Sequence, residues 1–324
     1  MNQIRIVFFG TPEFAASQLE AIISAGYDVA AVVTVPDKPA GRGKKLQCSE
    51  VKKKALLYGL PLLQPEKMRD PLFLEELTSY NANLFVVVAF RMLPAIVWQM
   101  PSLGTFNLHA SLLPQYRGAA PINHAIINGE TDTGLTTFFL NEEIDKGAII
   151  LQQKVSILPN ETAGELHDKL MALGNTMVVD TIRLIEKGKA SAVEQENIAG
   201  DQELKPAPKI FKTFCYININ DDCLSVHNLV RGLSPYPAAH VILQSESGES
   251  IDLKVFKTEM ERCNHKLEIG QVDTDNKKHV RIALKDGFIS LIEVQQSGKR
   301  AMPIEDFLRG TPLKGSWKAL ENPF

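Results

Sequence analysis

The stretch IRIVFFGTPEFAASQLEAIISAG, residues 4–26, decides the fold of the first half of the chain. Residues 4–9 are almost wholly apolar, as expected for a parallel strand that is buried on both faces of a sheet. Gly10 permits a tight turn, Thr11 can cap a helix, and Pro12 suits the first position of that helix. Apolar side chains further along then give the helix one buried side. The stretch therefore predicts a strand–turn–helix unit.

Strand and helix signals continue to alternate up to about residue 186. Further strands are predicted at residues 29–35, 84–89, 105–108, 135–140 and 149–155. Helices are predicted at residues 49–58, 70–80, 119–128 and 162–186, the last of which opens with a Thr162-x-x-Glu165 capping box. This alternation predicts an α/β fold with a Rossmann-like, doubly wound sheet, whose ligands gather at the carboxyl ends of the strands. The turn at Gly10 lacks the later glycines of a dinucleotide fingerprint, which argues against NAD or FAD.

The pattern changes near residue 188. Residues 189–208 are polar, lack apolar periodicity and end in two prolines, as in a linker draped over a surface. A helix at 221–233 follows, and then short strands that are separated by turn signals, at residues 240–244, 251–257, 279–284 and 288–295. Short strands of this kind predict a small β-barrel or sandwich. The expected domains are therefore residues 1–188 and 209–324.

Composition narrows the class of protein. A chain of 324 residues suggests two domains, and its mean hydropathy of -0.06 is that of a soluble protein. We expect no membrane span and no secretory leader, because the chain opens directly on a strand. Its four cysteines lack CxxC pairing and zinc-like spacing, so we expect a cytoplasmic protein without a metal. We also expect a monomer.

The segment GTFNLHASLLP, residues 104–114, carries the strongest chemical signal. Side chains alternate along a strand, so Asn107 and His109 point to the same side. Asp145, in the turn after the next strand, could orient the imidazole and favour its charged form. An amide, an imidazole and a carboxylate suit acyl transfer to an amine, which needs no serine or cysteine nucleophile. Spacing alone also allows each of these residues a structural role.

A second signal is the cluster of cations early in the chain, at Lys38, Arg42, Lys44, Lys45 and residues 52–54. From charge alone, such a run is typical of a solvated surface. The whole chain has a net charge of -3, which argues against a general nucleic-acid binder.

The run NLHASLLPQYRGAAPI, residues 107–122, resembles the signature of the formyltransferases that depend on 10-formyltetrahydrofolate. Residues 35–46, VPDKPAGRGKKL, and 10–15, GTPEFA, are similar to the members of that family that act on methionyl-tRNA. The similarity runs from residue 4 to about 318 and includes residues 206–210 and 298–302.

The resemblance implies that Asn107, His109 and Asp145 are catalytic. It implies that 10-formyltetrahydrofolate, as co-substrate, is bound by Ser111, Leu112, Leu113 and Pro114. It implies an OB-like barrel in the C-terminal domain, and initiator methionyl-tRNA as the acceptor of the formyl group. The basic loop, residues 37–46, would then contact the tRNA through Lys38, Arg42, Lys44 and Lys45. A local patch in the C-terminal domain would contact it through Lys209, Lys299 and Arg300.

Two alternatives remain open from the sequence. A related formyltransferase or hydrolase with the same trio could act on a small amine, a sugar nucleotide or water, although such acceptors give no role to the basic loop. A tRNA-binding module with an inactive core would not need Asn107, His109 and Asp145 together. The chain departs from the family at residues 90–94, FRMLP, where contacts with the folate are in doubt.

Overall fold

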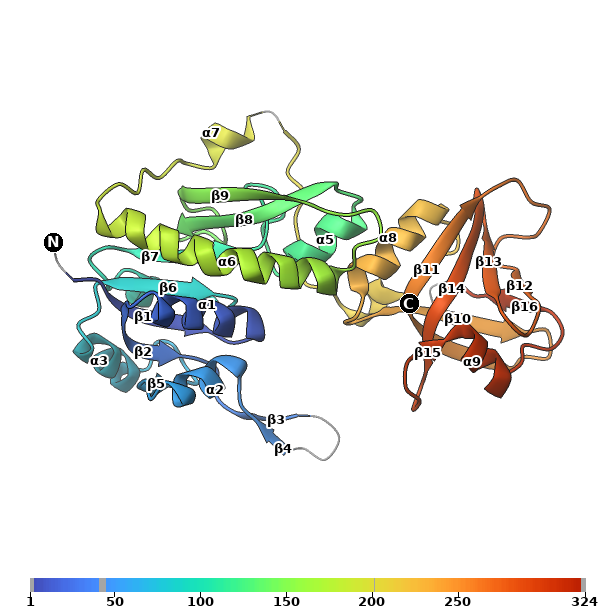
Figure 1. The fold of residues 1–324 in the computed structure, drawn as a ribbon, viewed down its shortest axis with the longest axis horizontal. Coiled ribbons are helices and arrows are strands. Elements are labelled where there is room, and N and C mark those ends of the chain that lie inside the picture. Colours follow the sequence, from blue (N-terminus) through green and yellow to red (C-terminus); the bar gives the residue numbers. More distant parts are fainter. Residues whose placement is uncertain (1–2, 41–44, 201, 322–324) are drawn as a thin grey trace. The chain divides into compact units, whose positions relative to one another are not determined.

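The computed structural model describes residues 3–40, 45–200 and 202–321 (Figure 1). Its Cα positions divide into two units. The first comprises residues 1–118, 133–155 and 167–206, and the second comprises residues 119–132, 156–166 and 207–324. The second unit thus takes in two segments that the sequence-based division gives to the first domain. The predicted boundaries at residues 188 and 208 stay a proposal.

The first unit is built on a seven-stranded sheet in the order β5-β2-β1-β6-β7-β8-β9. Its strands are β1 (Arg5–Gly10), β2 (Asp28–Val33), β5 (Leu62–Leu63), β6 (Leu84–Val88), β7 (Thr105–His109), β8 (Asp132–Phe139) and β9 (Ile149–Ser156). The first five of these pair in parallel, and β8 runs antiparallel to β7. The chain extends the sheet on one side of β1 and then resumes at β6 on its other side, which confirms the doubly wound α/β prediction.

Helices cover both faces of this sheet. They are α1 (Glu13–Ser24), α2 (Glu50–Leu57), α3 (Pro71–Ser79), α4 (Ala95–Trp98) and α6 (Ala163–Glu186), whereas the short helix α7 (Glu196–Ala199) buries none of its residues. A buried apolar cluster joins one face to α3 and α4 and includes Phe9, Val87 and Val97. A short hairpin, β3 (Lys38–Ala40) with β4 (Lys45–Gln47), lies apart from the main sheet.

The orientation of β7 follows from its neighbours. A Cβ on Gly174 of α6 would lie 3.1 Å both from Leu108 and from Gln18 of α1, so Leu108 faces α6. Figure 1 shows α6 running alongside the strands. Because side chains alternate along a strand, Asn107 and His109 point to the opposite face, on the side of Val87.

Two of the predicted helix starts can be compared with the structure. The capping box at α6 is confirmed, since the Thr162 N–H donates to Glu165 Oε2 at 2.8 Å and the Glu165 N–H to Thr162 Oγ1 at 3.3 Å. The prediction that Thr11 caps α1 is wrong. Pro12 takes the N-cap position with extended backbone, and it has no hydroxyl to offer.

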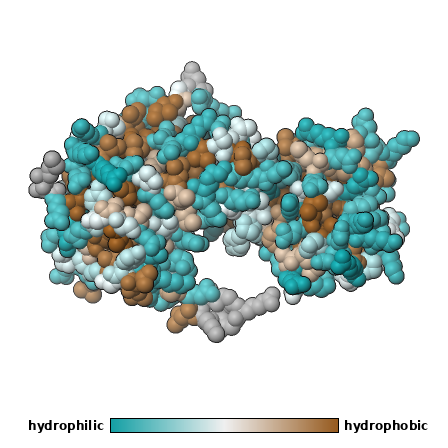
Figure 2. Space-filling model, in the orientation of Figure 1, coloured by the Kyte–Doolittle hydropathy of each residue, from teal (hydrophilic) through white to brown (hydrophobic). Residues whose placement is uncertain are grey.

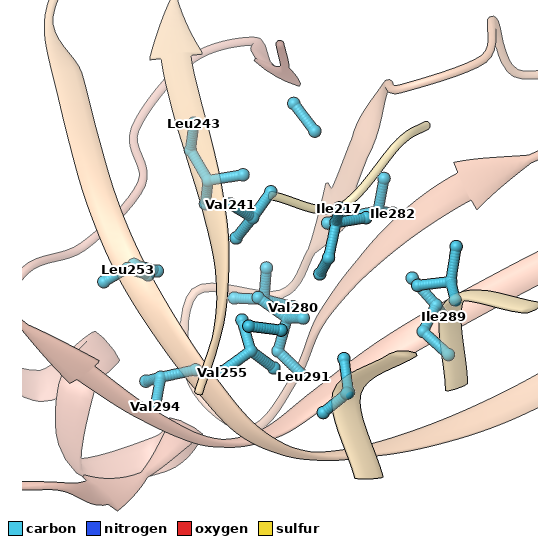
Figure 3. Close-up of a cluster of buried hydrophobic side chains, with 14 of the residues drawn as sticks. Ile217, Val241, Leu243, Leu253, Val255, Val280, Ile282, Ile289, Leu291 and Val294 are labelled. Atoms are coloured by element: carbon cyan, nitrogen blue, oxygen red, sulfur yellow. The ribbon is translucent and has the colours of Figure 1, made fainter. Parts of the chain in front are cut away.

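The second unit contains an antiparallel sheet in the order β12-β13-β14-β11-β10-β16, with β15 paired to β14. The strands are β10 (Ala239–Ser245), β11 (Ser250–Arg262), β12 (Val272–Thr274), β13 (Val280–Leu284), β14 (Gly287–Gln296), β15 (Met302–Pro303) and β16 (Trp317–Ala319). A bridge between Gln271 and Lys318 brings the two edges together, so the sheet is nearly closed into the predicted barrel. Figure 3 shows Val241, Val255, Val280 and Leu291 converging on its interior.

Helices complete this unit: α5 (Pro121–Ile127), the 3-10 helix η1 (Lys212–Cys215), α8 (Cys223–Leu233) and α9 (Ile304–Gly310). Helix α5 packs closely on α8, where Asn123 Nδ2 donates to the Gly232 carbonyl at 2.7 Å. A Cβ on Gly232 would lie only 2.6 Å from Ile127 of α5. The close packing of these two helices therefore requires glycine at position 232.

The surface is mixed in polarity. On the face shown in Figure 2, hydrophobic residues are scattered among hydrophilic ones on both units. Among the described residues, no helix combines the length and apolar character needed to cross a membrane.

The close approach at Gly232 gives a stability prediction. We expect Gly232→Ala to destabilise the second unit by about 1–3 kcal/mol, because its methyl group would overlap Ile127. Gly310→Ala is the matched control, a helical glycine of the same unit with open space around its Cα. Urea unfolding of the whole chain measures both variants. Equal stability of the two would contradict the packing argument.

Candidate active site

The carboxyl end of β7 carries the first two predicted site residues. Asn107 lies opposite Val87 of β6, and His109 lies opposite Thr136 of β8. Both therefore stand at the edge where a doubly wound sheet collects its ligands. Their side chains share the face opposite Leu108.

His109 is buried, with 7% of its surface exposed, and is held by two partners. Its Nε2 lies 2.9 Å from the Tyr116 carbonyl oxygen, which can only accept, so Nε2 carries a hydrogen. Its Nδ1 lies 3.9 Å from Asp145 Oδ2. That distance suits an ion pair when the ring is protonated but is too long for a hydrogen bond.

The task predicted for Asp145 alone, to orient the imidazole and favour its charged form, is thus divided between two groups. The Tyr116 carbonyl fixes the ring and its tautomer, while Asp145 supplies a negative charge beside the other nitrogen. The Asp145 carboxylate is held in turn by the Gly118 N–H, which donates to Oδ2 at 3.0 Å. The backbone of Asp145 has a φ of +54°, which is rare for a residue with a side chain.

Asn107 presents a polar atom without a protein partner. Its Oδ1 is buried and accepts no hydrogen bond from any of the described residues. A buried acceptor in this state costs free energy unless a ligand satisfies it. The side chain of Asn107 is therefore equipped to bind a polar group of a substrate next to His109.

The four residues predicted to bind folate form an internally bonded loop. Ser111, Leu113 and Pro114 are buried, and Ser111 Oγ donates to the Gln115 carbonyl at 2.7 Å. Thr136 Oγ1 donates to the Ser111 carbonyl at 2.7 Å and accepts the Leu113 N–H at 3.1 Å. Leu112 packs closely on Gly134. The loop is thus rigid before any ligand binds.

The turn at residues 90–94, where the sequence departs from the family, is anchored to residues 65–66 and to β1. The Arg91 guanidinium donates to the Glu66 carbonyl at 2.9 Å and to the Pro65 carbonyl. Partial burial lowers the pKa of Arg91, and Phe90 packs against Phe9 of β1.

The basic run separates into two groups. Lys52, Lys53 and Lys54 form ion pairs with Asp37, Glu50 and Glu20 respectively. The hydrogen bond from Lys52 holds the pKa of Asp37 below its usual range, which favours the charged form of this carboxyl group. For these three lysines the solvated-surface interpretation is adequate.

The other predicted tRNA contacts lie on the β3–β4 hairpin and in the second unit. Lys38 is exposed on β3, and Lys45 opens β4, whereas Arg42 and Lys44 lie outside the described residues. Lys299 and Arg300 are exposed after β14. Lys209 is exposed too, with its Nζ 5.6 Å from the centre of the Phe211 ring.

Sequence reasoning missed three residues that shape the site. Tyr116 acts through its backbone carbonyl, and Arg117 and Gln195 act through hydrogen bonds near Asp145. A backbone contact leaves no side-chain signature. The polarity of the segment that contains Gln195 predicts only a linker, although this glutamine is fully buried.

Within the described ranges, no group of three or more histidine, cysteine, aspartate or glutamate side chains is arranged to hold a metal ion. The four cysteines are all free thiols.

Comparison with known families assigns both halves of the chain. Residues 4–182 match the family model "Formyl transferase", and residues 209–312 match "Formyl transferase, C-terminal domain". The chain belongs to the formyl transferase family. This confirms the resemblance that was predicted from residues 107–122.

Three relatives of this formyl transferase carry the same name. It is 52% identical to "Methionyl-tRNA formyltransferase" of Parabacteroides distasonis, over 95% of this chain and 96% of the relative. It is 50% identical to the protein of the same name in Bacteroides thetaiotaomicron, over 98% of each chain. The corresponding protein of Flavobacterium johnsoniae is also 50% identical, over 96% of this chain and 97% of its own.

Solved structures support the fold. The N-formyltransferase of Helicobacter canadensis, in complex with folinic acid and dTDP-3-aminofucose, gives a TM-score of 0.63 at 19% identity, over 91% of this chain and all of its own. HypX of Aquifex aeolicus, in complex with tetrahydrofolic acid, gives 0.63 at 17% identity, over 97% of this chain and 48% of its own. At these identities the likeness shows a common fold.

Substitution of two threonines on β8 tests how much the hydrogen bonds of the Thr136 hydroxyl contribute to stability. Thr136 Oγ1 is fully buried and also accepts from Gln152 Nε2 at 3.0 Å, so we expect Thr136→Val to cost about 1–3 kcal/mol. Thr133 is equally buried, but its Oγ1 has no partner among the described residues. Thr133→Val should therefore be neutral or stabilising. Denaturant unfolding checks the pair, and a larger loss for Thr133→Val would refute the assignment.

Proposed function

We propose that this formyl transferase moves the formyl group of 10-formyltetrahydrofolate to the α-amino group of initiator methionyl-tRNA. The observation that carries the proposal is the arrangement at the end of β7, where the unsatisfied Oδ1 of Asn107 shares a face with an imidazole flanked by Asp145. The shared name of relatives that are about half identical over nearly the whole chain supports the acceptor.

Folate chemistry fits the residues present. The amine of methionine attacks the formyl carbon, and the bond from that carbon to N10 breaks as N10 takes up a proton. Asn107 offers a neutral amide, whose Nδ2 can donate to the formyl oxygen as it gains negative charge. Its buried Oδ1 can accept a hydrogen from the attacking amine, which satisfies the orphaned atom.

His109 is positioned to move the proton. Its Nε2 hydrogen is committed to the Tyr116 carbonyl, so Nδ1 is the nitrogen that exchanges a proton with the substrates. Nδ1 takes the proton that the amine loses and passes it to the departing N10. During that interval the ring is positively charged, and the carboxylate of Asp145 at 3.9 Å stabilises it.

The acceptor is the point on which rival formyl transferases differ. A solved relative of the same fold was crystallised with dTDP-3-aminofucose, a sugar nucleotide. The basic residues of this chain favour tRNA, because Lys38 is exposed on a hairpin that follows β2, and Arg42 and Lys44 lie in the same segment. Because the proposed acceptor is a tRNA used in translation, we propose that the enzyme is cytoplasmic. We also propose that it acts as a monomer.

Formyl transfer itself is the decisive measurement. With radiolabelled 10-formyltetrahydrofolate, the wild-type chain should label methionyl-tRNA, and His109→Ala should lower kcat by about 10²–10⁴-fold. Asn107→Ala should lower it by about 10²–10³-fold, because a donor to the oxyanion is lost. His167→Ala, at a partly exposed histidine paired with Asp168, is the control and should keep full activity. Failure of the wild type to label methionyl-tRNA would contradict the proposal.

Salt dependence tests the tRNA contact separately. Arg42→Ala should raise the KM for methionyl-tRNA, leave the KM for folate unchanged, and reduce the slope of log KM against log salt by about 1. Lys53→Ala is the control in the same basic run, because Lys53 is paired with Glu50. If both variants keep the wild-type slope, the basic loop does not contact phosphate.

A further inference from the structure

Gln195 stands out among the buried polar residues that the proposed mechanism does not use. Its side chain is fully buried, and its amide is fully bonded. Nε2 donates to the Asp145 carbonyl at 2.8 Å and to the Gly147 carbonyl at 2.9 Å. Oε1 accepts from Arg117 Nε at 3.0 Å and from Arg117 Nη2 at 2.7 Å. Carbonyls only accept and guanidinium only donates, so chemistry fixes which way the amide points.

The turn that Gln195 binds is strained at one residue and tightly packed at another. Asp145 has a φ of +54°, a left-handed conformation that is unfavourable for a residue with a side chain. Gly147 allows no side chain, since a Cβ there would lie 1.6 Å from the Phe139 carbonyl oxygen. Gln195 donates to the carbonyls on both sides of Lys146 and so closes this turn. We call these two hydrogen bonds the staple.

Arg117 connects the staple to the other half of the site. It directly follows Tyr116, whose carbonyl holds His109, and directly precedes Gly118, whose N–H binds the Asp145 carboxylate. The contact between Arg117 and Gln195 therefore ties the loop that holds the imidazole to the turn that holds the carboxylate. These two attachments act on the two side chains, His109 and Asp145, that lie 3.9 Å apart.

The segment around Gln195 is anchored at both ends within the first unit. Val193 exchanges two backbone hydrogen bonds with Ile149 of β9, at 2.8 and 2.9 Å. Further along, the Lys205 carbonyl accepts the Tyr116 N–H at 2.7 Å, and the Lys205 N–H donates to Gln115 Oε1 at 2.8 Å. A segment read from the sequence as a polar linker thus contacts both loops of the site.

We propose that Gln195 and Arg117 are positioning residues for formyl transfer, and that the connecting segment holds the carboxylate of Asp145 against the imidazole of His109. This inference rests on the proposed function, since it assumes that Asp145 serves the reaction. It assigns to the connecting segment a part in the chemistry in addition to its part in joining two domains.

The test uses two substitutions at one position. Gln195→Glu keeps the size and can still accept from Arg117, but an ionised carboxylate cannot donate to the Asp145 and Gly147 carbonyls. Gln195→Ala removes both attachments. Gln202→Ala is the matched control, because Gln202 is an exposed glutamine of the same segment. All variants are made in the full chain and assayed for formyl transfer to methionyl-tRNA.

We expect both Gln195 variants to lower kcat by about 10–100-fold, with the KM for either substrate changed less than about 3-fold, because a misplaced carboxylate affects the charged state of the reaction more than binding. In an Asp145→Asn background, the same substitutions should lower kcat by less than about 2-fold. A purely structural role would give the same loss in both backgrounds, and that result would overturn the proposal, as would unchanged kcat in Gln195→Ala.

Hydrogen exchange provides a readout that does not depend on the acceptor. Gln195→Glu should speed exchange of the Gly118 amide, which donates to Asp145, and of the amides in the 145–147 turn, while Gln202→Ala should not. Unchanged protection at these amides would reject the staple. If the wild type transfers no formyl group to methionyl-tRNA but protection falls as expected, the proposed function fails and the structural link between Gln195 and Asp145 stands.

Discussion

The hydrogen bond from His109 Nε2 to the Tyr116 carbonyl joins the carboxyl end of the parallel sheet to the loop that follows it. A buried imidazole needs a partner for its N–H, and residues 110–116 supply one by folding back over the end of β7. That return brings Gly118 to the carboxylate of Asp145 and leaves Nδ1 facing it. The geometry of the candidate site thus follows from one satisfied donor at the end of a strand.

Rigidity around this point comes from buried polar contacts. Thr136 holds the 111–114 loop with two hydrogen bonds of its hydroxyl, which accepts a third from Gln152. Gln195 holds the 145–147 turn with two hydrogen bonds from its Nε2. Such networks are costly when broken and specify a single arrangement when complete. Asn107 is the exception, because its Oδ1 has no partner among the described residues. A site whose loop and turn are held by hydrogen bonds, while Asn107 Oδ1 is not, is suited to receive a polar substrate at that atom.

The basic residues of this formyl transferase differ in whether a neighbouring carboxylate neutralises them. Lysines 52–54 are neutralised by neighbouring carboxylates, whereas Lys38 on the adjacent hairpin is exposed. Both belong to one basic run in the sequence, and only the fold separates them. In the C-terminal unit, Lys209, Lys299 and Arg300 are exposed, although the unit as a whole carries little net charge. Recognition of tRNA by local contacts is compatible with a chain whose overall charge is -3.

The sequence by itself determined the longer strands and helices and the family, but not short elements such as β5, β16 and α4. Apolar runs such as residues 4–9 and 84–89, and the capping box at Thr162, act over a few residues and need no knowledge of the rest of the chain. The motif at residues 107–114 likewise placed Asn107 and His109 on one face of a strand. Tertiary structure alone decided that Tyr116 fixes the imidazole and that Gln195 reaches Asp145. These contacts join a side chain to backbone carbonyls, over 50 residues in the second case, and any residue has a carbonyl, so no pattern in the sequence marks which one will be used.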